Sequence, residues 1–183
     1  MRTMTMCLTA ALLIAPAGLL AQDSTSTGKA GPQARIDAAL STALSAGVPV
    51  SLLEGKIAEG KAKGVSMDRI AAAVEQRLEA LTTAQAAMTK AGIKNSTDGE
   101  LSVAADAVQA GVSQSALAAV SQGAPDGSRA VAIAVLTDLV AQGQASAQAL
   151  ERVQTALARG PEALANLGAQ VAGNGHAEAG LGA

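Results

Sequence analysis

The stretch that decides the fold is "AGVPVSLLEGKIAEGKAKGVSMDRIAAAV", which runs from Ala46 to Val74 and contains one phrase twice. Gly47-Val48-Pro49 and Gly64-Val65-Ser66 each introduce a helical pattern, and Gly111-Val112-Ser113 repeats the phrase later. A glycine just past a helix takes the left-handed conformation that ends it. A serine two residues further on caps the next helix by accepting a bond from a backbone N–H. The phrase therefore predicts a joint between two helices.

Apolar residues around these joints have the spacing of a hydrophobic staple. With Ser66 as the N-cap, Val65 precedes the helix and Ile70 is its fourth residue. Residues at these two positions pack together and fix the angle at which the chain enters the helix. Val112 and Leu117 repeat the spacing. A joint of this kind needs no ligand, so the repetition indicates architecture rather than chemistry.

Outward from this stretch, glycines separate segments whose apolar residues recur at helical spacing. The expected helices cover residues 33–46, 50–63, 67–90, 98–110, 114–122, 129–142, 146–159 and 161–172. The segment 129–142 is apolar nearly all round, which is typical of a helix at the centre of a fold. The glycine spacings keep no single period. We therefore expect an irregular all-α array of about eight short antiparallel helices joined by Gly-capped turns, with a short solenoid-like stack as the alternative to a helical bundle.

Several local signals mark where these helices begin, weaken or stop. Thr97 and Glu100 have the spacing of a capping box, and Glu59 and Lys63 form a favourable ion pair one turn apart. Gly55 and Gly60 weaken the second helix or allow another helix to approach closely. The turn-rich "GAPDGS" at 123–128 predicts a break and is the best candidate for a hinge.

The first residues have the layout of a secretory signal peptide. Met1-Arg2 is short and basic, Cys7–Leu20 is apolar, and the chain turns polar after Ala21. We predict a signal peptide at 1–21, with cleavage after Ala17 or an uncleaved anchor as alternatives. A flexible linker at 22–31, a helical domain at 32–172 and a disordered tail at 173–183 follow. The protein is thus expected to be exported, to a periplasmic or extracellular location.

Composition excludes several kinds of function. Alanine makes up about a quarter of the chain, and Phe, Tyr and Trp are absent. Without aromatic rings there is no platform on which bases stack, and a formal net charge of −2 provides no attraction for nucleic acid. The single cysteine, Cys7, lies in the predicted signal peptide, so the mature chain has no disulfide. Methyl-rich helix faces remain, and they favour protein or peptide partners.

Few residues suggest catalysis or metal binding. His176 is the sole histidine and lies in a glycine-rich tail, where nothing would fix its orientation for catalysis or for a metal. "NSTDGE" at 95–100 is too sparse for a calcium loop and indicates a turn and a helix cap. Its Asn95-Ser96-Thr97 also matches an N-glycosylation sequon, which matters only in a host that glycosylates. We predict no cofactor, no metal and no catalytic residue.

Asp138 is the strongest candidate for a functional carboxylate, because it interrupts the most apolar helix. One hypothesis makes it half of a general acid/base pair with Asp106. The favoured alternative places Asp138 on a narrow exposed face, or pairs it with an arginine such as Arg77 or Arg152.

Leu81-Thr82-Thr83-Ala84-Gln85 has the form LTxxQ. It resembles a motif of the small exported helical chaperone and stress-adaptor proteins of the bacterial periplasm, the Spy and CpxP type. That family carries the motif twice on a highly charged chain, whereas here it occurs once. The resemblance implies a periplasmic chaperone-like function; the other interpretation is a Thr82–Gln85 capping box or ordinary residues inside a long helix.

The sequence as a whole predicts an exported, non-enzymatic helical protein. It would act as a protein-interaction or structural module that binds another protein, or its own copies, through an Ala/Leu/Val face. The chaperone-like function is the alternative. No segment after the signal peptide is long and apolar enough to suggest a stable membrane span.

Overall fold

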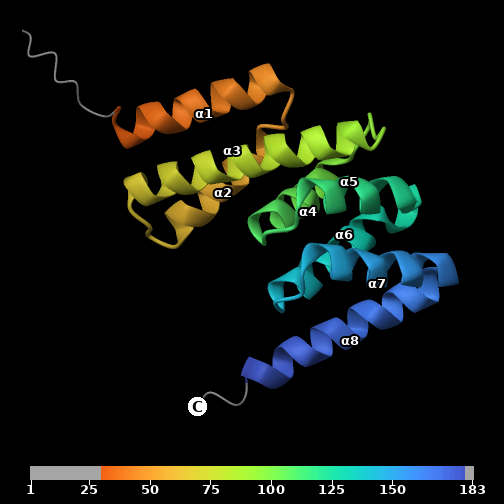
Figure 1. Ribbon diagram of the computed structural model, residues 1–183. Coiled ribbons are helices and arrows are strands. Elements are labelled where there is room, and N and C mark those ends of the chain that lie inside the picture. Colours follow the sequence, from red (N-terminus) through yellow and green to blue (C-terminus); the bar gives the residue numbers. More distant parts are fainter. Residues whose placement is uncertain (1–29, 180–183) are drawn as a thin grey trace, which may run out of the picture.

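The computed structural model describes the backbone of residues 30–179 and the side chains of residues 30–173. Regular structure in this part of the chain is entirely α-helical (Figure 1). The eight helices are α1 (Pro32–Ala46), α2 (Ser51–Ala62), α3 (Met67–Lys90), α4 (Asp98–Gln109), α5 (Gln114–Gly123), α6 (Asp126–Ala141), α7 (Ser146–Arg159) and α8 (Pro161–Ala179). The predicted all-α array of short helices is confirmed.

The glycine–valine phrase forms a hydrogen-bonded turn at each joint. Gly47 has a φ of 68°, and its N–H donates to the carbonyl of Leu44. The N–H of Val48 donates to the carbonyl of Ala43 at 2.9 Å. These two bonds satisfy carbonyls that the end of a helix leaves free, and an apolar residue after the glycine accompanies them. The same pair of bonds forms at Gly64 and Gly111, so the phrase encodes a helix end.

The observed capping bonds match the sequence-based prediction at two helix starts and differ from it at a third. Thr97 and Glu100 form the predicted capping box, and the Ser113 hydroxyl accepts a bond from the N–H of Ala116 at 3.2 Å. Ser66 stands at the N-cap of α3 with extended backbone, but its side chain makes no capping bond. The predicted cap at Ser66 is therefore wrong. The Gly64 turn and the buried Ile70 fix this joint without it.

Two helix boundaries differ from the sequence-based prediction by more than one residue. Helix α6 begins at Asp126, so the interruption predicted over 123–128 shrinks to Ala124 and Pro125. An acidic residue in the first turn favours the earlier start through the helix dipole. Helix α8 continues through residues 173–179, which we expected to be a disordered tail. Extending an existing helix is easier than starting one. A hinge at this interruption stays a prediction.

The remaining domain assignments lie outside the described residues. These are the signal peptide at 1–21, most of the linker at 22–31 and the last residues of the tail at 180–183.

The helices form a stack of two layers. Helix pairs in substantial contact lie one or two elements apart in the chain: α3 packs on α1 and α2, α5 on α3 and α4, and α7 on α5 and α6. The odd-numbered helices follow one another in one layer, and α4, α6 and α8 follow one another in the other. This order is that of a short solenoid-like stack. Helices α1 and α8 consequently lie at opposite ends of the molecule (Figure 1).

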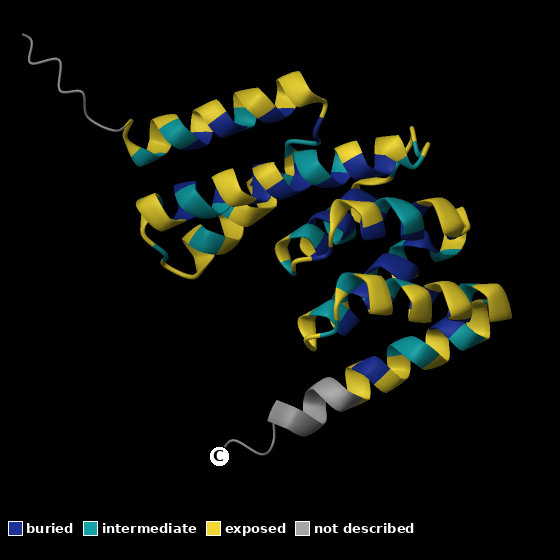
Figure 2. Cartoon of the chain, viewed as in Figure 1, coloured by how far each residue is buried: buried dark blue, intermediate teal, exposed yellow. Residues whose placement is uncertain are grey.

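The core is a continuous seam between the layers. Buried residues lie on the sides of the ribbons that face neighbouring helices (Figure 2), and the buried hydrophobic residues form one cluster. Helix α6 contacts α4, α5, α7 and α8, and its Ile133, Leu136 and Leu139 are fully buried, which confirms its predicted central place. Many other buried positions are alanine, so neighbouring helices can approach closely but bury little area at each contact.

Candidate functional site

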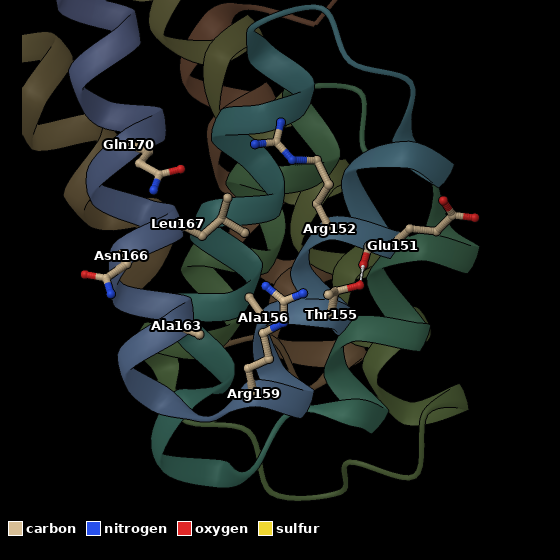
Figure 3. Close-up of a pocket in the computed structure, with 9 residues that line it drawn as sticks. All are labelled: Glu151, Arg152, Thr155, Ala156, Arg159, Ala163, Asn166, Leu167 and Gln170. Atoms are coloured by element: carbon tan, nitrogen blue, oxygen red, sulfur yellow. Dashed lines mark hydrogen bonds between the residues drawn. The ribbon is translucent and has the colours of Figure 1, made fainter.

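A groove between α7 and α8 is the best candidate for a binding site among the described residues (Figure 3). It has a volume of about 530 Å³. Helix α7 contributes two arginines, and α8 contributes two side-chain amides. The lining residues are Glu151, Arg152, Thr155, Ala156, Arg159, Ala163, Asn166, Leu167 and Gln170.

The groove arises from the spacing of residues along both helices. Arg152 and Arg159 lie two turns apart on α7, and Asn166 and Gln170 lie one turn apart on α8. An α-helix advances about 100° for each residue, so residues at these spacings share a face. The core-facing side chains of the two helices, such as Val153 on α7, lie on a different face. The groove therefore opens away from the core.

The floor of the groove is apolar. Ala156 is buried and Leu167 is half-buried, and Figure 3 shows the Leu167 side chain pointing from α8 into the space between the helices. Beneath it, α8 is held tightly to the stack. The Gln142 amide donates to the carbonyl of Val171 at 2.7 Å, and a Cβ on Gly168 would lie 3.1 Å from Val135. These contacts fix the position of α8 beneath the groove.

Charged and hydrogen-bonding groups border this floor. Arg152 and Arg159 are exposed, and neither forms an ion pair with another described residue. Glu151 is the one carboxylate of the lining, and its backbone carbonyl accepts a bond from the Thr155 hydroxyl at 2.8 Å. A guanidinium presents a planar fork of donors that matches a carboxylate. The groove can therefore hold an apolar side chain beside two carboxylates.

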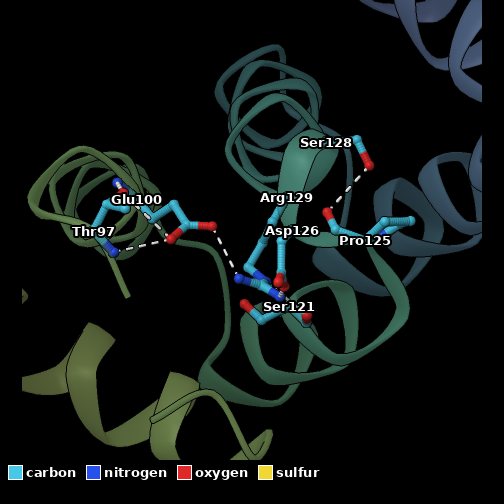
Figure 4. Close-up of polar contacts among 7 residues, drawn as sticks. All are labelled: Thr97, Glu100, Ser121, Pro125, Asp126, Ser128 and Arg129. Carbon is cyan, nitrogen blue, oxygen red and sulfur yellow. Dashed lines mark hydrogen bonds and ion pairs between the residues drawn. The ribbon is translucent and has the colours of Figure 1, made fainter. Parts of the chain in front are cut away.

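A second polar cluster is buried between α4, α5 and α6 (Figure 4). Arg129 donates to Glu100 at 2.9 Å, to the carbonyl of Ser121 at 3.2 Å and to Asp126. The other carboxylate oxygen of Glu100 accepts from the N–H of Thr97 at 3.0 Å. The Ser121 hydroxyl is buried and has no hydrogen-bond partner among the described residues. The charges satisfy one another and the start of α4, so the cluster fastens three helices, with the Asp126 side chain at its exposed edge.

Arg77 fastens α3 to α4 in a similar way. Its guanidinium donates to Asp106 at 2.5 Å and to the Ser102 hydroxyl at 2.8 Å. Arg77 is 9% exposed, so its side chain is committed to this interface.

The two aspartates of the acid/base hypothesis lie on different helices, Asp106 on α4 and Asp138 on α6, and Asp106 is paired with Arg77. Asp138 is exposed on α6 and forms no ion pair with a described residue, which agrees with its predicted place on a narrow exposed face. The alternative pairing of Asp138 with Arg77 or Arg152 is wrong, since Arg77 bonds Asp106 instead. Packing decided this partner, because Arg77 and Asp106 face each other across the α3–α4 contact.

The other segments singled out in the sequence have local roles. The Thr97–Glu100 bonds make "NSTDGE" a turn followed by a helix cap, as predicted. The backbone at His176 is helical, and its side chain lies outside the described part. Among the described residues, no three His, Cys, Asp or Glu side chains are placed to hold a metal ion.

The LTxxQ segment lies in the interior of α3. Leu81 is fully buried, and the Thr82 hydroxyl donates to the carbonyls of Leu78 and Glu79 within its own helix. Gln85 donates to the carbonyl of Gly47 at 3.3 Å. These residues therefore hold α3 together and fasten it to the turn after α1, and of the two ordinary interpretations the interior of a long helix is correct.

Sequence reasoning missed the arginine-bordered groove and the buried Arg129. The sequence suggests Arg152 only as a partner for Asp138 and assigns no role to Arg159. The signal in the sequence was the two-turn spacing of Arg152 and Arg159 on one face, followed across Gly160 by amides one turn apart. These spacings show which residues share a face of one helix, but they do not show that the face of α7 and the face of α8 meet.

No family model, no curated protein and no solved structure matches this chain. Within the described residues, no helix combines the length and the apolar character needed to cross a bilayer.

Proposed function

We propose that this chain is an exported, non-enzymatic protein-binding module whose binding site is the groove between α7 and α8. The observation that carries the proposal is the pair of arginines, Arg152 and Arg159, which border an apolar floor and form no ion pair with a described residue. The export part of the proposal rests on the N-terminal sequence alone.

The groove is best suited to an acidic amphipathic helix of a protein partner. An apolar side chain of that helix would lie against Leu167 and Ala156, and its carboxylates would meet the two guanidinium groups. Helices dock in grooves between helices by inserting ridges of side chains. The Asn166 and Gln170 amides would add hydrogen bonds at the border of the site.

The partner surface differs from the broad Ala/Leu/Val face expected from the sequence. The apolar stripes pack inside the stack, and the described residues include only two large hydrophobic side chains that are substantially exposed, Leu44 at 71% and Val131 at 47%. A small groove with charged borders, rather than a wide apolar face, is therefore proposed as the interface. The chaperone-like alternative draws no support from Leu81–Gln85, since this segment is engaged within the stack.

A peptide titration tests the proposal. Two synthetic helical peptides would share the same leucine stripe, and one would carry glutamates where the other carries lysines. We expect the acidic peptide to shift the side-chain amide NMR signals of Asn166 and Gln170. The variant Arg152→Glu/Arg159→Glu should weaken this binding at least tenfold. Both arginines are exposed, so the variant should keep its helical circular dichroism. Equal binding of the two peptides, or no shift at these amides, would overturn the proposal.

A further inference from the structure

The two ends of the stack carry grooves with opposite charge. At the first end, a groove of about 370 Å³ lies between α1 and α2, and its lining includes Asp37, Leu40, Glu54, Ala58 and Lys61. Its charged groups are two carboxylates and one ammonium. At the other end, the α7–α8 groove has two guanidinium groups and one carboxylate. Each set of charges is the inverse of the other.

The apolar parts of the two grooves also correspond. Residues 33, 37, 40 and 44 share one face of α1, because their spacings are three or four residues. Leu44 extends this face and is 71% exposed. At the far end, Leu167 and Ala156 form the apolar floor between the arginines. Each end therefore offers leucine and alanine methyl groups beside charges that the other end can neutralise.

The order of the stack indicates where another helix would lie. Each odd-numbered helix from α3 to α7 packs on the two helices before it in the chain. The next such position would contact α7 and α8, and among the described helices nothing lies there. Helix α1 is the first of the odd-numbered helices and lies at the opposite end of the molecule (Figure 1). A second copy can therefore supply α1 as the next helix of the stack.

We propose that the protein associates with itself head to tail, with the α1–α2 end of one copy docked on the α7–α8 groove of the next. This inference rests on the proposed function, since it names the partner of the same groove. Asp37 and Glu54 of one copy would neutralise Arg152 and Arg159 of its neighbour, and Lys61 would meet Glu151. An interface between two different patches leaves a free end on each side, so the contact repeats and produces chains or rings. A net charge near zero adds little repulsion between copies.

A charge-swap experiment tests this arrangement. The full chain would be studied by sedimentation with interference detection, because it has no Phe, Tyr or Trp to absorb at 280 nm. We expect the natural chain to associate with increasing concentration. The association constant should fall at least tenfold in each of two double variants, Asp37→Lys/Glu54→Lys and Arg152→Glu/Arg159→Glu. An equimolar mixture of the two variants should restore the association, since each end then meets an end of opposite charge.

The matched control is Asp138→Lys, a charge reversal at an exposed site on α6 that lines neither groove. It should associate like the natural chain, and circular dichroism should show the same helicity for every variant. Failure of the mixture to associate, or association unchanged in both double variants, would overturn the head-to-tail contact. A natural chain that stays monomeric while its α7–α8 groove still binds acidic helical peptides would overturn it too, and would leave the proposed function standing with a foreign partner.

Discussion

The guanidinium of Arg129 lies 2.9 Å from the carboxylate of Glu100, and the two residues are 29 positions apart in the chain. Glu100 has two tasks at once, because it also accepts a bond from the N–H of Thr97 and so caps α4. One buried carboxylate thereby joins the start of α4 to α6. A third group, Asp126, shares the same guanidinium but has a side chain that is 93% exposed.

This arrangement predicts unequal roles for the two carboxylates around Arg129. Glu100→Ala should lower the free energy of unfolding by about 3 kcal/mol, because it leaves a buried guanidinium without its buried partner and removes a cap. Asp126→Asn should lower it by less than about 1 kcal/mol, since exposed ion pairs contribute little. Urea unfolding followed by circular dichroism measures both. Equal losses in the two variants would contradict the assignment of Glu100 as the principal partner.

Three residues at helix starts provide a graded test of capping. Thr97→Ala and Ser113→Ala should each lower the free energy of unfolding by about 1 kcal/mol, because each side chain accepts a bond from a free backbone N–H. Ser66→Ala should change it by no more than a few tenths of a kcal/mol, since the Ser66 side chain makes no capping bond. The three variants can be compared by urea unfolding under identical conditions. A loss at Ser66 as large as at Ser113 would show that its hydroxyl does cap α3.

The two glycines within α2 should respond to alanine in opposite ways. Gly55→Ala should raise the free energy of unfolding by about 0.5–1 kcal/mol, because a Cβ there meets nothing within 4 Å and alanine favours helix. Gly60→Ala should lower it by about 1 kcal/mol or more, since its Cβ would lie 2.7 Å from Cγ1 of the buried Ile70. Thermal unfolding of each variant measures the difference. Stabilisation by Gly60→Ala would refute the close approach of α2 to α3.

Glu59 should titrate at unusually low pH. Hydrogen bonds from Lys63 and Lys56 lower its pKa from 4.5 to about 2. A carboxyl group with a lowered pKa in the folded state stabilises the fold above its ordinary pKa, and this contribution disappears as the pH falls towards 2. NMR titration of the side-chain carboxyl carbon measures the pKa directly. The variant Lys56→Met/Lys63→Met should raise it towards 4.5, as should about 1 M salt, because these groups are exposed to solvent. An unchanged pKa in the lysine variant would rule out this cause.

Asp138→Asn should change the free energy of unfolding by less than about 0.5 kcal/mol. The side chain is exposed and forms no ion pair with a described residue, and substitutions at such sites have small effects. Chemical unfolding beside the natural protein is the measurement. A loss above about 1 kcal/mol would reveal a structural partner of Asp138.

The sequence by itself determined where most helices end and how the chain turns between them. Helices end at Gly47, Gly64 and Gly111 because glycine readily adopts the left-handed conformation. The hydrogen bonds of each turn join residues no more than five positions apart in the chain. The Thr97–Glu100 box is equally local. The apolar pattern of residues 129–142 was enough to place that helix at the centre.

Only the tertiary structure decided which residues meet. Arg77 bonds Asp106 across 29 positions, and the arginines of α7 border a groove because α8 folds back beside them. The sequence around Ser66 is as suitable for a cap as that around Ser113, yet only Ser113 forms the capping bond. Local rules concern neighbours along one helix, whereas these contacts depend on how far apart and at what angle two helices pack. In this chain the distance and the angle between packed helices are set by which positions carry alanine and which carry larger side chains.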